Sequence, residues 1–335
     1  MTRSAPDATA PASTGPGSTP TARDGPAGIA LRCQGLVKRY GDVTAVDGLD
    51  LEVRRGECFG LLGPNGAGKT TTIEILEGLL AADAGTVDVL GLRWGRDDRQ
   101  LRERLGIQLQ ETQFSDKLTV AEITRLFRSF YARGRAVDEI LALVGLETKR
   151  DARYVSLSGG QKQRLAVACA LVGAPDVLFL DEPTTGLDPQ SRRQLWSLLE
   201  GYRAGGGTIL LTTHYMDEAE ALCDRVAVVD KGKVIALGTP RELIRSLGAE
   251  HVVEFAMVDG EPLPEPDRLR PLPGVRDVRV QGPTCGLVAS EIHLAIPALL
   301  DLLGDRRTKL AFLTTHSATL EDVFMHLTGR HLRDA

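Results

Sequence analysis

Short apolar runs alternate with stretches of helical periodicity through the middle of the chain. Residues 58–62, 177–180 and 209–212 are apolar or nearly so, which is typical of strands buried on both faces of a parallel sheet. Helical patterns of apolar residues follow at 71–80 and at 189–203. Buried strands that alternate with helices predict an α/β core.

Two regions beside this core have the pattern of paired strands. Residues 31–53 carry short strand-like runs, with turns predicted at residues 40–42 and 47–48. Residues 225–229 and 233–237 flank a tight Asp-Lys-Gly turn, which predicts a hairpin.

The long segment between the first two core strands has a different pattern. Residues 96–153 are charged and mostly helical, and Thr119 with Glu122 forms the signature of a capping box at a helix start. Residues 161–172 are expected to form another helix, and residues 217–223 a short one.

The two ends of the chain differ from the middle. Residues 1–28 are rich in Pro, Ala, Thr, Ser and Gly and lack the apolar residues that offset ordering entropy, so we expect a disordered tail. We expect residues 29–247 to form the main domain and residues 248–335 a small α+β accessory domain. Helices are predicted there at 297–303, with the proline in the first turn, and at 320–327.

Composition narrows the class of protein. Hydrophobic residues make up 42% and charged residues 25% of the 335 residues, as in a globular protein with a sizeable core. The formal net charge of −5 argues against nucleic acid as a partner of the whole fold. The five cysteines form no CxxC pair, so we expect buried free thiols in a reducing cytosol and no zinc site.

A glycine-rich loop follows the apolar run at 58–62 and precedes a helical stretch that includes Thr71. It satisfies the G-x-x-x-x-G-K-[ST] pattern, in which backbone N–H groups surround phosphate oxygens at the positive end of a helix. Lys69 is expected to reach the β- and γ-phosphates, and the Thr70 hydroxyl to bind Mg²⁺. A glycine-rich turn with an incidental lysine is the alternative, and the strand and helix on either side argue against it. The loop reads Gly63, Pro64, Asn65, Gly66, Ala67, Gly68, Lys69, Thr70.

Two carboxylates end the apolar run at 177–180. Asp181 is placed to hold the Mg²⁺ shell, because it follows a buried strand beside the phosphate loop. Glu182 comes next and is placed to act as general base on the attacking water. A solvated acidic pair is the alternative, and the phosphate loop makes it the weaker one. The phosphate loop alone would leave kinases, GTPases and many ATPases open.

Residues 157–161, Leu-Ser-Gly-Gly-Gln, narrow the class further. A Ser-Gly-Gly at a helix start offers a second anion site, with backbone amides and the Ser158 hydroxyl in front of the helix dipole. With this motif, which is called the signature below, residues 30–245 resemble the ABC ATPase family. The resemblance implies a P-loop NTPase core with an antiparallel β subdomain and a helical subdomain. It also implies that Ser158, Gly159, Gly160 and Gln161 complete the ATP site of a second subunit in a head-to-tail dimer.

Four further positions match the family. Tyr40 resembles the aromatic residue that stacks on adenine, and Gln110 the glutamine that touches Mg²⁺ and the lytic water. Gln108 and Gln113 lie close to Gln110, but Glu111 follows Gln110, as is common in this loop. Asp188 resembles the residue of the loop that passes between the two sites. His214 resembles the switch histidine at the γ-phosphate.

The resemblance implies hydrolysis of ATP with Mg²⁺. The catalytic residues would be Glu182, His214, Gln110 and Lys69, and the Mg²⁺ ligands Thr70, Gln110 and Asp181. The dimer would contain two copies of this chain or one copy and a close relative. No apolar run approaches the roughly 18 residues that span a bilayer, and the start lacks the apolar centre of a secretory signal. The protein is therefore expected at the cytoplasmic face of the membrane, bound peripherally to a separate permease.

The end of the chain bears on the subfamily. Residues 318–324, Ala-Thr-Leu-Glu-Asp-Val-Phe, and 327–329 resemble the tail of bacterial ATPases that serve ABC-2-type exporters, including the daunorubicin resistance group. The residues around Gln110 are similar to that group as well. A generic amphipathic dimerisation helix is the alternative.

Two rival functions share the same ATPase motifs. Chromosome-organising ATPases insert a long coiled coil between the phosphate loop and the signature, where this chain has fewer than one hundred residues and no sustained heptads. Soluble translation or regulatory factors usually carry two ATPase domains, and this chain has one phosphate loop. A transporter subunit remains the favoured function.

Overall fold

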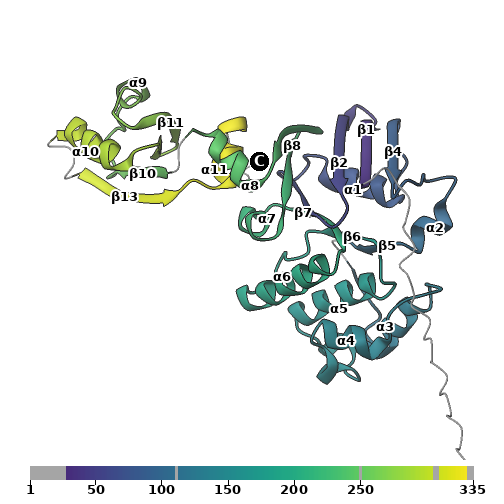
Figure 1. Cartoon of the computed structure of the whole chain (residues 1–335). Helices are drawn as coiled ribbons and strands as arrows, with labels where there is room; N and C mark the ends of the chain where they lie inside the picture. Colours follow the sequence, from purple (N-terminus) through teal and green to yellow (C-terminus); the bar gives the residue numbers. More distant parts are fainter. Residues whose placement is uncertain (1–27, 110–111, 249–250, 305–308, 330–335) are drawn as a thin grey trace, which may run out of the picture.

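A six-stranded sheet forms the centre of the computed structural model, which describes residues 28–109, 112–248, 251–304 and 309–329 (Figure 1). The strand order is β5-β6-β7-β3-β8-β9, in which β9 is antiparallel to β8 and the other neighbours are parallel. Every residue of β3, β6 and β7 is buried, as their apolar runs predict. The strands are β3 Cys58–Leu62, β5 Leu105–Gln108, β6 Val177–Asp181, β7 Thr208–Thr213, β8 Arg225–Asp230 and β9 Lys233–Gly238.

Helix α1 (Lys69–Glu77) lies between this sheet and a three-stranded antiparallel sheet of order β2-β1-β4. One apolar cluster joins α1 to both sheets, so the strands of the smaller sheet are fixed on the same helix that begins at the phosphate loop. The strands are β1 Ile29–Tyr40, β2 Val43–Arg54 and β4 Ala84–Val89.

Helices cover the opposite face of the central sheet, and a second apolar cluster joins them to it (Figure 1). The capping box predicted at Thr119 is confirmed: its hydroxyl accepts the Glu122 N–H, and the Glu122 carboxylate accepts the Thr119 N–H. The helices are α3 Val120–Arg128, α4 Val137–Leu143, α5 Gly159–Leu171, α6 Pro189–Ala204 and α7 Met216–Leu222, with the short α2 Asp98–Arg102 beside β5 and 3₁₀ turns at Glu147–Lys149 and Tyr154–Ser156.

The C-terminal part has a separate antiparallel sheet of order β11-β12-β10-β13, which extends away from α3, α4 and α5 in Figure 1. A third apolar cluster joins the sheet to α9 and α10. The elements are α8 Pro240–Ser246, β10 His251–Met257, α9 Pro266–Leu269, β11 Val275–Gln281, β12 Thr284–Ala289, α10 Ile292–Leu303, β13 Leu310–Ser317 and α11 Leu320–Thr328.

The chain returns to the main domain at its last helix. α11 packs against α7 and α8, and its Leu320 N–H donates to the Glu220 carboxylate of α7 at 2.8 Å. Phe324 is fully buried in the same cluster as α5 and α6. The C-terminal sheet is therefore tied to the main domain at both ends, through α8 and through α11. The domain boundaries at residues 28 and 247 stay predictions.

Three details differ from the expectations. Residues 47–48 form no turn: β2 continues through them with a bulge, because Leu36 pairs with Leu49 and Val37 with Asp47. Strand β5 was not predicted, since its four residues lie inside a charged, helical stretch. The helix predicted at 297–303 begins at Ile292, so Pro297 lies inside it and not in its first turn.

The disordered tail predicted at residues 1–28 lies outside the described residues except for Gly28. Among the described helices, none is both long and apolar enough to cross a membrane.

Candidate nucleotide-binding site

The phosphate loop connects β3 to α1 and fits against two other strands through its glycines. Gly68 caps α1 in the left-handed region at φ 99°, and a Cβ there would lie 2.2 Å from the Ala45 carbonyl oxygen. A Cβ on Gly63 would lie 2.3 Å from the Val229 carbonyl oxygen. The motif therefore needs glycine at these two positions for packing inside the chain as well as for access of backbone amides to phosphate.

Lys69 lies inside this loop and is only 5% exposed. Its ammonium group donates to the carbonyl oxygens of Gly63, at 2.7 Å, and Pro64, at 3.0 Å. Burial lowers the pKa of Lys69, and the nearby carboxylates of Glu182 and Asp181 oppose that shift. The loop is thus already curled around a buried cation, which is the arrangement that binds a phosphate chain.

Asp181 and Thr70 lie beside each other at the carboxyl end of β6. Asp181 is buried and accepts a hydrogen bond from the Thr212 hydroxyl of β7. Burial raises the pKa of Asp181, while hydrogen bonds from the Thr212 and Thr70 hydroxyls lower it. The pair fits Mg²⁺, because a carboxylate and a hydroxyl supply two hard oxygen ligands and phosphate and water supply the rest.

Glu182 has an unusual backbone conformation, left-handed at φ 47°. Its N–H donates to the Thr212 hydroxyl at 3.0 Å, and its Oε2 accepts from the Thr185 hydroxyl at 3.1 Å. A non-glycine residue in the left-handed region costs on the order of 1–3 kcal/mol. Such a conformation persists only where the surrounding structure holds it in place, and it is common at functional sites. The strain turns Glu182 away from the direction of β6.

The Glu182 carboxylate lies between two other candidate residues. Its Oε1 is 4.0 Å from the Lys69 ammonium and 3.2 Å from Nδ1 of His214. His214 follows β7 directly, is partly exposed, and its ring lies 4.1 Å from the Tyr215 ring. Three residues from three sequence regions therefore meet at the ends of β3, β6 and β7.

The Leu-Ser-Gly-Gly-Gln motif lies elsewhere, at the start of α5. Ser158 caps the helix and forms a capping box with Gln161, and both Ser158 and Gly159 are exposed. No hydrogen bond or ion pair between described residues joins this helix start to the phosphate loop. The structure of one chain therefore leaves the two predicted anion sites apart.

Asp188 lies at the start of α6 and contacts the signature indirectly. It caps α6 by accepting the N–H groups of Gln190 and Ser191, and its carboxylate accepts the Ser191 hydroxyl at 2.6 Å. These hydrogen bonds lower the pKa of Asp188. A Cβ on Gly160 would lie 2.3 Å from the same Ser191 hydroxyl oxygen. The Asp188 loop and the signature helix thus pack against each other within one chain.

One predicted residue, Tyr40, remains apart from this network. Tyr40 is 49% exposed at the end of β1, with the Lys38 ammonium 5.7 Å from the centre of its ring. Gln110 lies outside the described residues, and the alternative Gln108 is buried in β5, where its amide donates to the Leu109 carbonyl oxygen.

Sequence reasoning missed Thr212, which contacts both acidic residues of the site. Its hydroxyl donates to Asp181 and accepts the Glu182 N–H. The only signal in the sequence is a threonine at the end of an apolar strand. That signal is weak, because threonine is also favoured in strands for its branched side chain.

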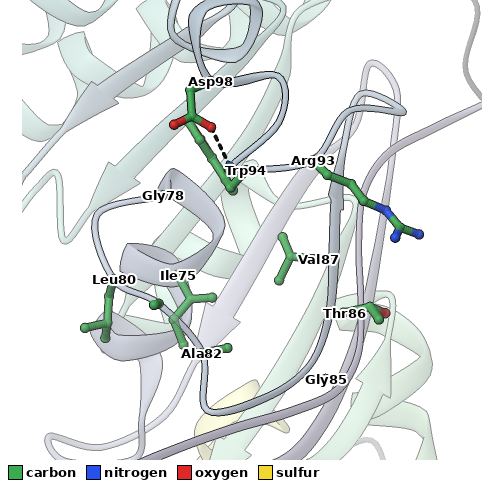
Figure 2. Close-up of a pocket in the computed structure, with 12 residues that line it drawn as sticks. Ile75, Gly78, Leu80, Ala82, Gly85, Thr86, Val87, Arg93, Trp94 and Asp98 are labelled. Atoms are coloured by element: carbon green, nitrogen blue, oxygen red, sulfur yellow. Dashed lines mark hydrogen bonds between the residues drawn. The ribbon is translucent and has the colours of Figure 1, made fainter.

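A cavity of about 490 Å³ lies at the opposite end of α1 from the phosphate loop. Figure 2 shows Gly78, Leu80 and Trp94 on its wall. None of the predicted nucleotide-binding residues lines it, so it is not part of the candidate site.

Comparisons with known proteins agree with the geometry. The model of the ABC transporter family matches residues 46–185. The "Nod factor export ATP-binding protein I" of Paraburkholderia xenovorans (strain LB400) is 43% identical over 313 residues, which cover 91% of this chain and 99% of the relative. The protein of the same name from Ralstonia nicotianae (strain ATCC BAA-1114 / GMI1000) is 42% identical and covers 97% of this chain and 98% of the relative.

Solved structures give the same result for the main domain. An ATP-binding subunit of an ABC transporter matches with a TM-score of 0.60 and 30% identity, over 65% of this chain and 93% of that chain. A bacterial ABC transporter cassette solved as a dimer matches with a TM-score of 0.57 and 25% identity, over 62% and 98%. With an α/β cassette fold, a phosphate loop around Lys69 and relatives matched over nearly their whole length, the chain belongs to the ATP-binding subunits of ABC transporters, which are ATPases coupled to transport.

Proposed function

We propose that two copies of this chain, or one copy and a close relative, form a head-to-tail dimer that hydrolyses ATP with Mg²⁺. The energy drives export through a separate ABC-2-type permease, to which the protein binds peripherally at the cytoplasmic face of the membrane. The observation that carries the proposal is the position of the Glu182 carboxylate between Lys69 and His214.

Each residue of the site has a role in ATP + H₂O → ADP + phosphate. Backbone amides of residues 63–71 and the Lys69 ammonium bind the phosphate chain. Glu182 accepts the proton of the water whose oxygen attacks the γ-phosphorus, and His214 orients the γ-phosphate. Thr70, Asp181 and Gln110 would hold Mg²⁺, which would supply positive charge to neutralise the phosphates. Tyr40 stacks on the adenine ring.

The second copy completes the site. Ser158, Gly159, Gly160 and Gln161 of one copy contact the γ-phosphate bound to the other, and Asp188 passes between the two sites. The exposure of the Ser158 helix start supports this arrangement, because an exposed helix N-terminus can bind an anion that another subunit carries. A similar cassette solved as a dimer supports it too.

Export is the direction that the relatives support, since both matched proteins are named for Nod factor export. The tail at residues 318–329 supports the ABC-2 subfamily. Substrate selection belongs to the permease, so the substrate class is outside this proposal.

The test is Glu182→Gln, which keeps the size of the side chain and removes the base. We expect turnover to fall by roughly 10²–10⁴-fold, because a general base contributes that much. ATP binding is expected to persist and an ATP-dependent dimer to accumulate, measured by ATPase assay and by size-exclusion chromatography with ATP. Wild-type turnover in this variant would overturn the general-base assignment.

A further inference from the structure

A buried carboxyl group outside the proposed catalytic residues lies between α6 and α7. Glu218 is 0% exposed, and its Oε1 accepts the indole N–H of Trp196 in α6 at 3.3 Å. α6 begins directly after Asp188, and α7 begins two residues after His214. Glu218 therefore connects the helices that follow two parts of the proposed site, the Asp188 loop and the switch histidine.

Two threonines lie near the same carboxyl, one from each of those two parts. Thr184 lies in the loop between Glu182 and Asp188, and Thr213 is the last residue of β7, before His214. Burial raises the pKa of Glu218, while the Thr213, Thr184 and Trp196 donors lower it, so all three act on one carboxyl. Both threonines are buried.

The contact between Thr184 and Glu218 is not closed in this structure. Among the described residues, neither the Thr184 hydroxyl oxygen nor Glu218 Oε2, both buried, has a hydrogen-bond partner. Unsatisfied buried polar atoms are costly, and a hydrogen bond from the Thr184 hydroxyl to Glu218 would satisfy both atoms. A position of the Thr184 loop that forms this bond would therefore be lower in energy.

Side chains also hold α6 and α7 together on the exposed side of their contact. Arg192 of α6 donates to the Asp217 carboxylate of α7 at 3.0 Å, and its guanidinium lies 4.5 Å from the centre of the Tyr215 ring. The first turns of α6 and α7 therefore make contacts on both the buried and the exposed side, so a shift of one helix is passed to the other.

From this geometry we propose that Glu218 is a positioning residue for ATP hydrolysis. It joins the Asp188 loop, through Thr184, to the end of β7 that carries His214, through Thr213, with Trp196 holding its other oxygen. The proposal rests on the proposed function, in which the Asp188 loop contacts the second ATP site. Through Glu218, the position of that loop sets the position of the switch histidine.

The decisive variants are Glu218→Ala and Glu218→Gln, compared with Glu200→Ala, which removes an exposed carboxylate from α6. We expect Glu218→Ala to lower kcat about tenfold or more, since small misplacements of catalytic groups have effects of that size. KM for ATP should stay within about threefold, because no proposed ATP contact is removed. Glu218→Gln should recover most of kcat, since its amide oxygen can accept from Trp196 and its NH₂ can donate to a threonine oxygen. Glu200→Ala should match the wild type.

The proposal is overturned by a folded Glu218→Ala protein with wild-type kcat, or by a Glu218→Gln protein as impaired as Glu218→Ala. A fall in kcat and in ATP affinity together would mean general disruption and would also overturn it. If Glu218→Ala does not fold, Trp196→Phe and Thr184→Val remove single donors at nearly constant volume. The same kcat-specific loss is expected in both, and wild-type kcat in both would contradict the proposal.

The Glu182→Gln experiment separates the two proposals. If Glu182→Gln keeps wild-type turnover, the proposed function fails whatever Glu218 does. If Glu182→Gln behaves as expected and Glu218→Ala is unaffected, only the role of Glu218 fails.

Discussion

The starts of α1 and α5 are both glycine-containing helix N-termini, yet they differ in burial and in charge. At α1, Gly68 is packed against β2 and the Lys69 ammonium is buried among carbonyl oxygens of its own loop. At α5, Ser158 and Gly159 are exposed and the helix start is closed only by its own capping box. Lys162, the nearest lysine after the motif, lies over the Tyr154 ring at 4.7 Å and not at the helix start.

The same local element, a helix N-terminus, can therefore serve as two kinds of half-site. A helix N-terminus attracts an anion through its dipole and free N–H groups, but the attraction is weak where water screens it. The interior start at α1 adds a desolvated cation and can bind phosphate without cover from another surface. The surface start at α5 can contribute strongly only when another surface covers it and excludes water, which is what a head-to-tail dimer would do.

The largest expected effect comes from breaking the interior half-site. Lys69→Ala should reduce turnover by about 10²–10³-fold or more, because a preorganised charge aimed at the reacting group has effects of that size. ATP binding by the monomer should weaken too, since the lysine contacts the phosphates before hydrolysis. An ATPase assay and calorimetric ATP titration measure the two effects. Lys149→Ala, at an exposed 3₁₀ turn, is the control, and ATP binding unchanged in Lys69→Ala would contradict the assignment.

The next largest effect comes from breaking the surface half-site. Ser158→Arg places a bulky cation at the exposed helix start and should abolish the ATP-dependent dimer and its turnover. ATP binding to the monomer should stay within about threefold of the wild type, because the phosphate loop is untouched. Size-exclusion chromatography in the Glu182→Gln background measures the dimer. Ser129→Arg, at the exposed end of α3, controls for bulk, and loss of ATP binding in Ser158→Arg would refute the two-body site.

A smaller effect, on stability, follows from the burial of α1. Burial raises the pKa of Glu77, at the end of that helix, to about 8. The folded protein keeps the Glu77 proton over a pH range where the unfolded chain, with an ordinary carboxyl pKa of 4.5, has lost it. The free energy of unfolding therefore falls as pH rises from about 4.5 to 8, and changes little above that through this group.

Glu77→Gln should remove this dependence and stabilise the protein at pH 8 by an amount on the order of 3–5 kcal/mol, with little effect at pH 5. Differential scanning calorimetry at pH 5 to 8 measures the change in Tm relative to the wild type. Glu147→Gln, at an exposed site, should show no such trend. An equal shift at every pH would contradict a buried, protonated Glu77.

Much of the fold was predictable where the signal is local. The apolar runs of β3, β6 and β7, the hairpin of β8 and β9 and the capping box at Thr119 all depend on residues near one another in the chain. Prediction was less accurate where packing between distant segments decides which element forms and where it begins. Pro297 lies inside α10 because the helix also packs on the sheet through Ala295 and Leu299, which extends it before the proline. β5 forms because it pairs with β6, a partner about seventy residues away in the sequence.

The sequence by itself determined which chemistry the main domain contains, because the phosphate loop, the Asp181-Glu182 pair and the signature are contiguous motifs whose spacing alone encodes their geometry. Only the tertiary structure decided which of these residues meet. It brings Glu182 to Lys69 and His214, leaves Ser158 on the surface, and buries Glu218 between α6 and α7. The physical reason is that such contacts depend on the order and register of strands and on close packing between distant segments, which no local pattern records.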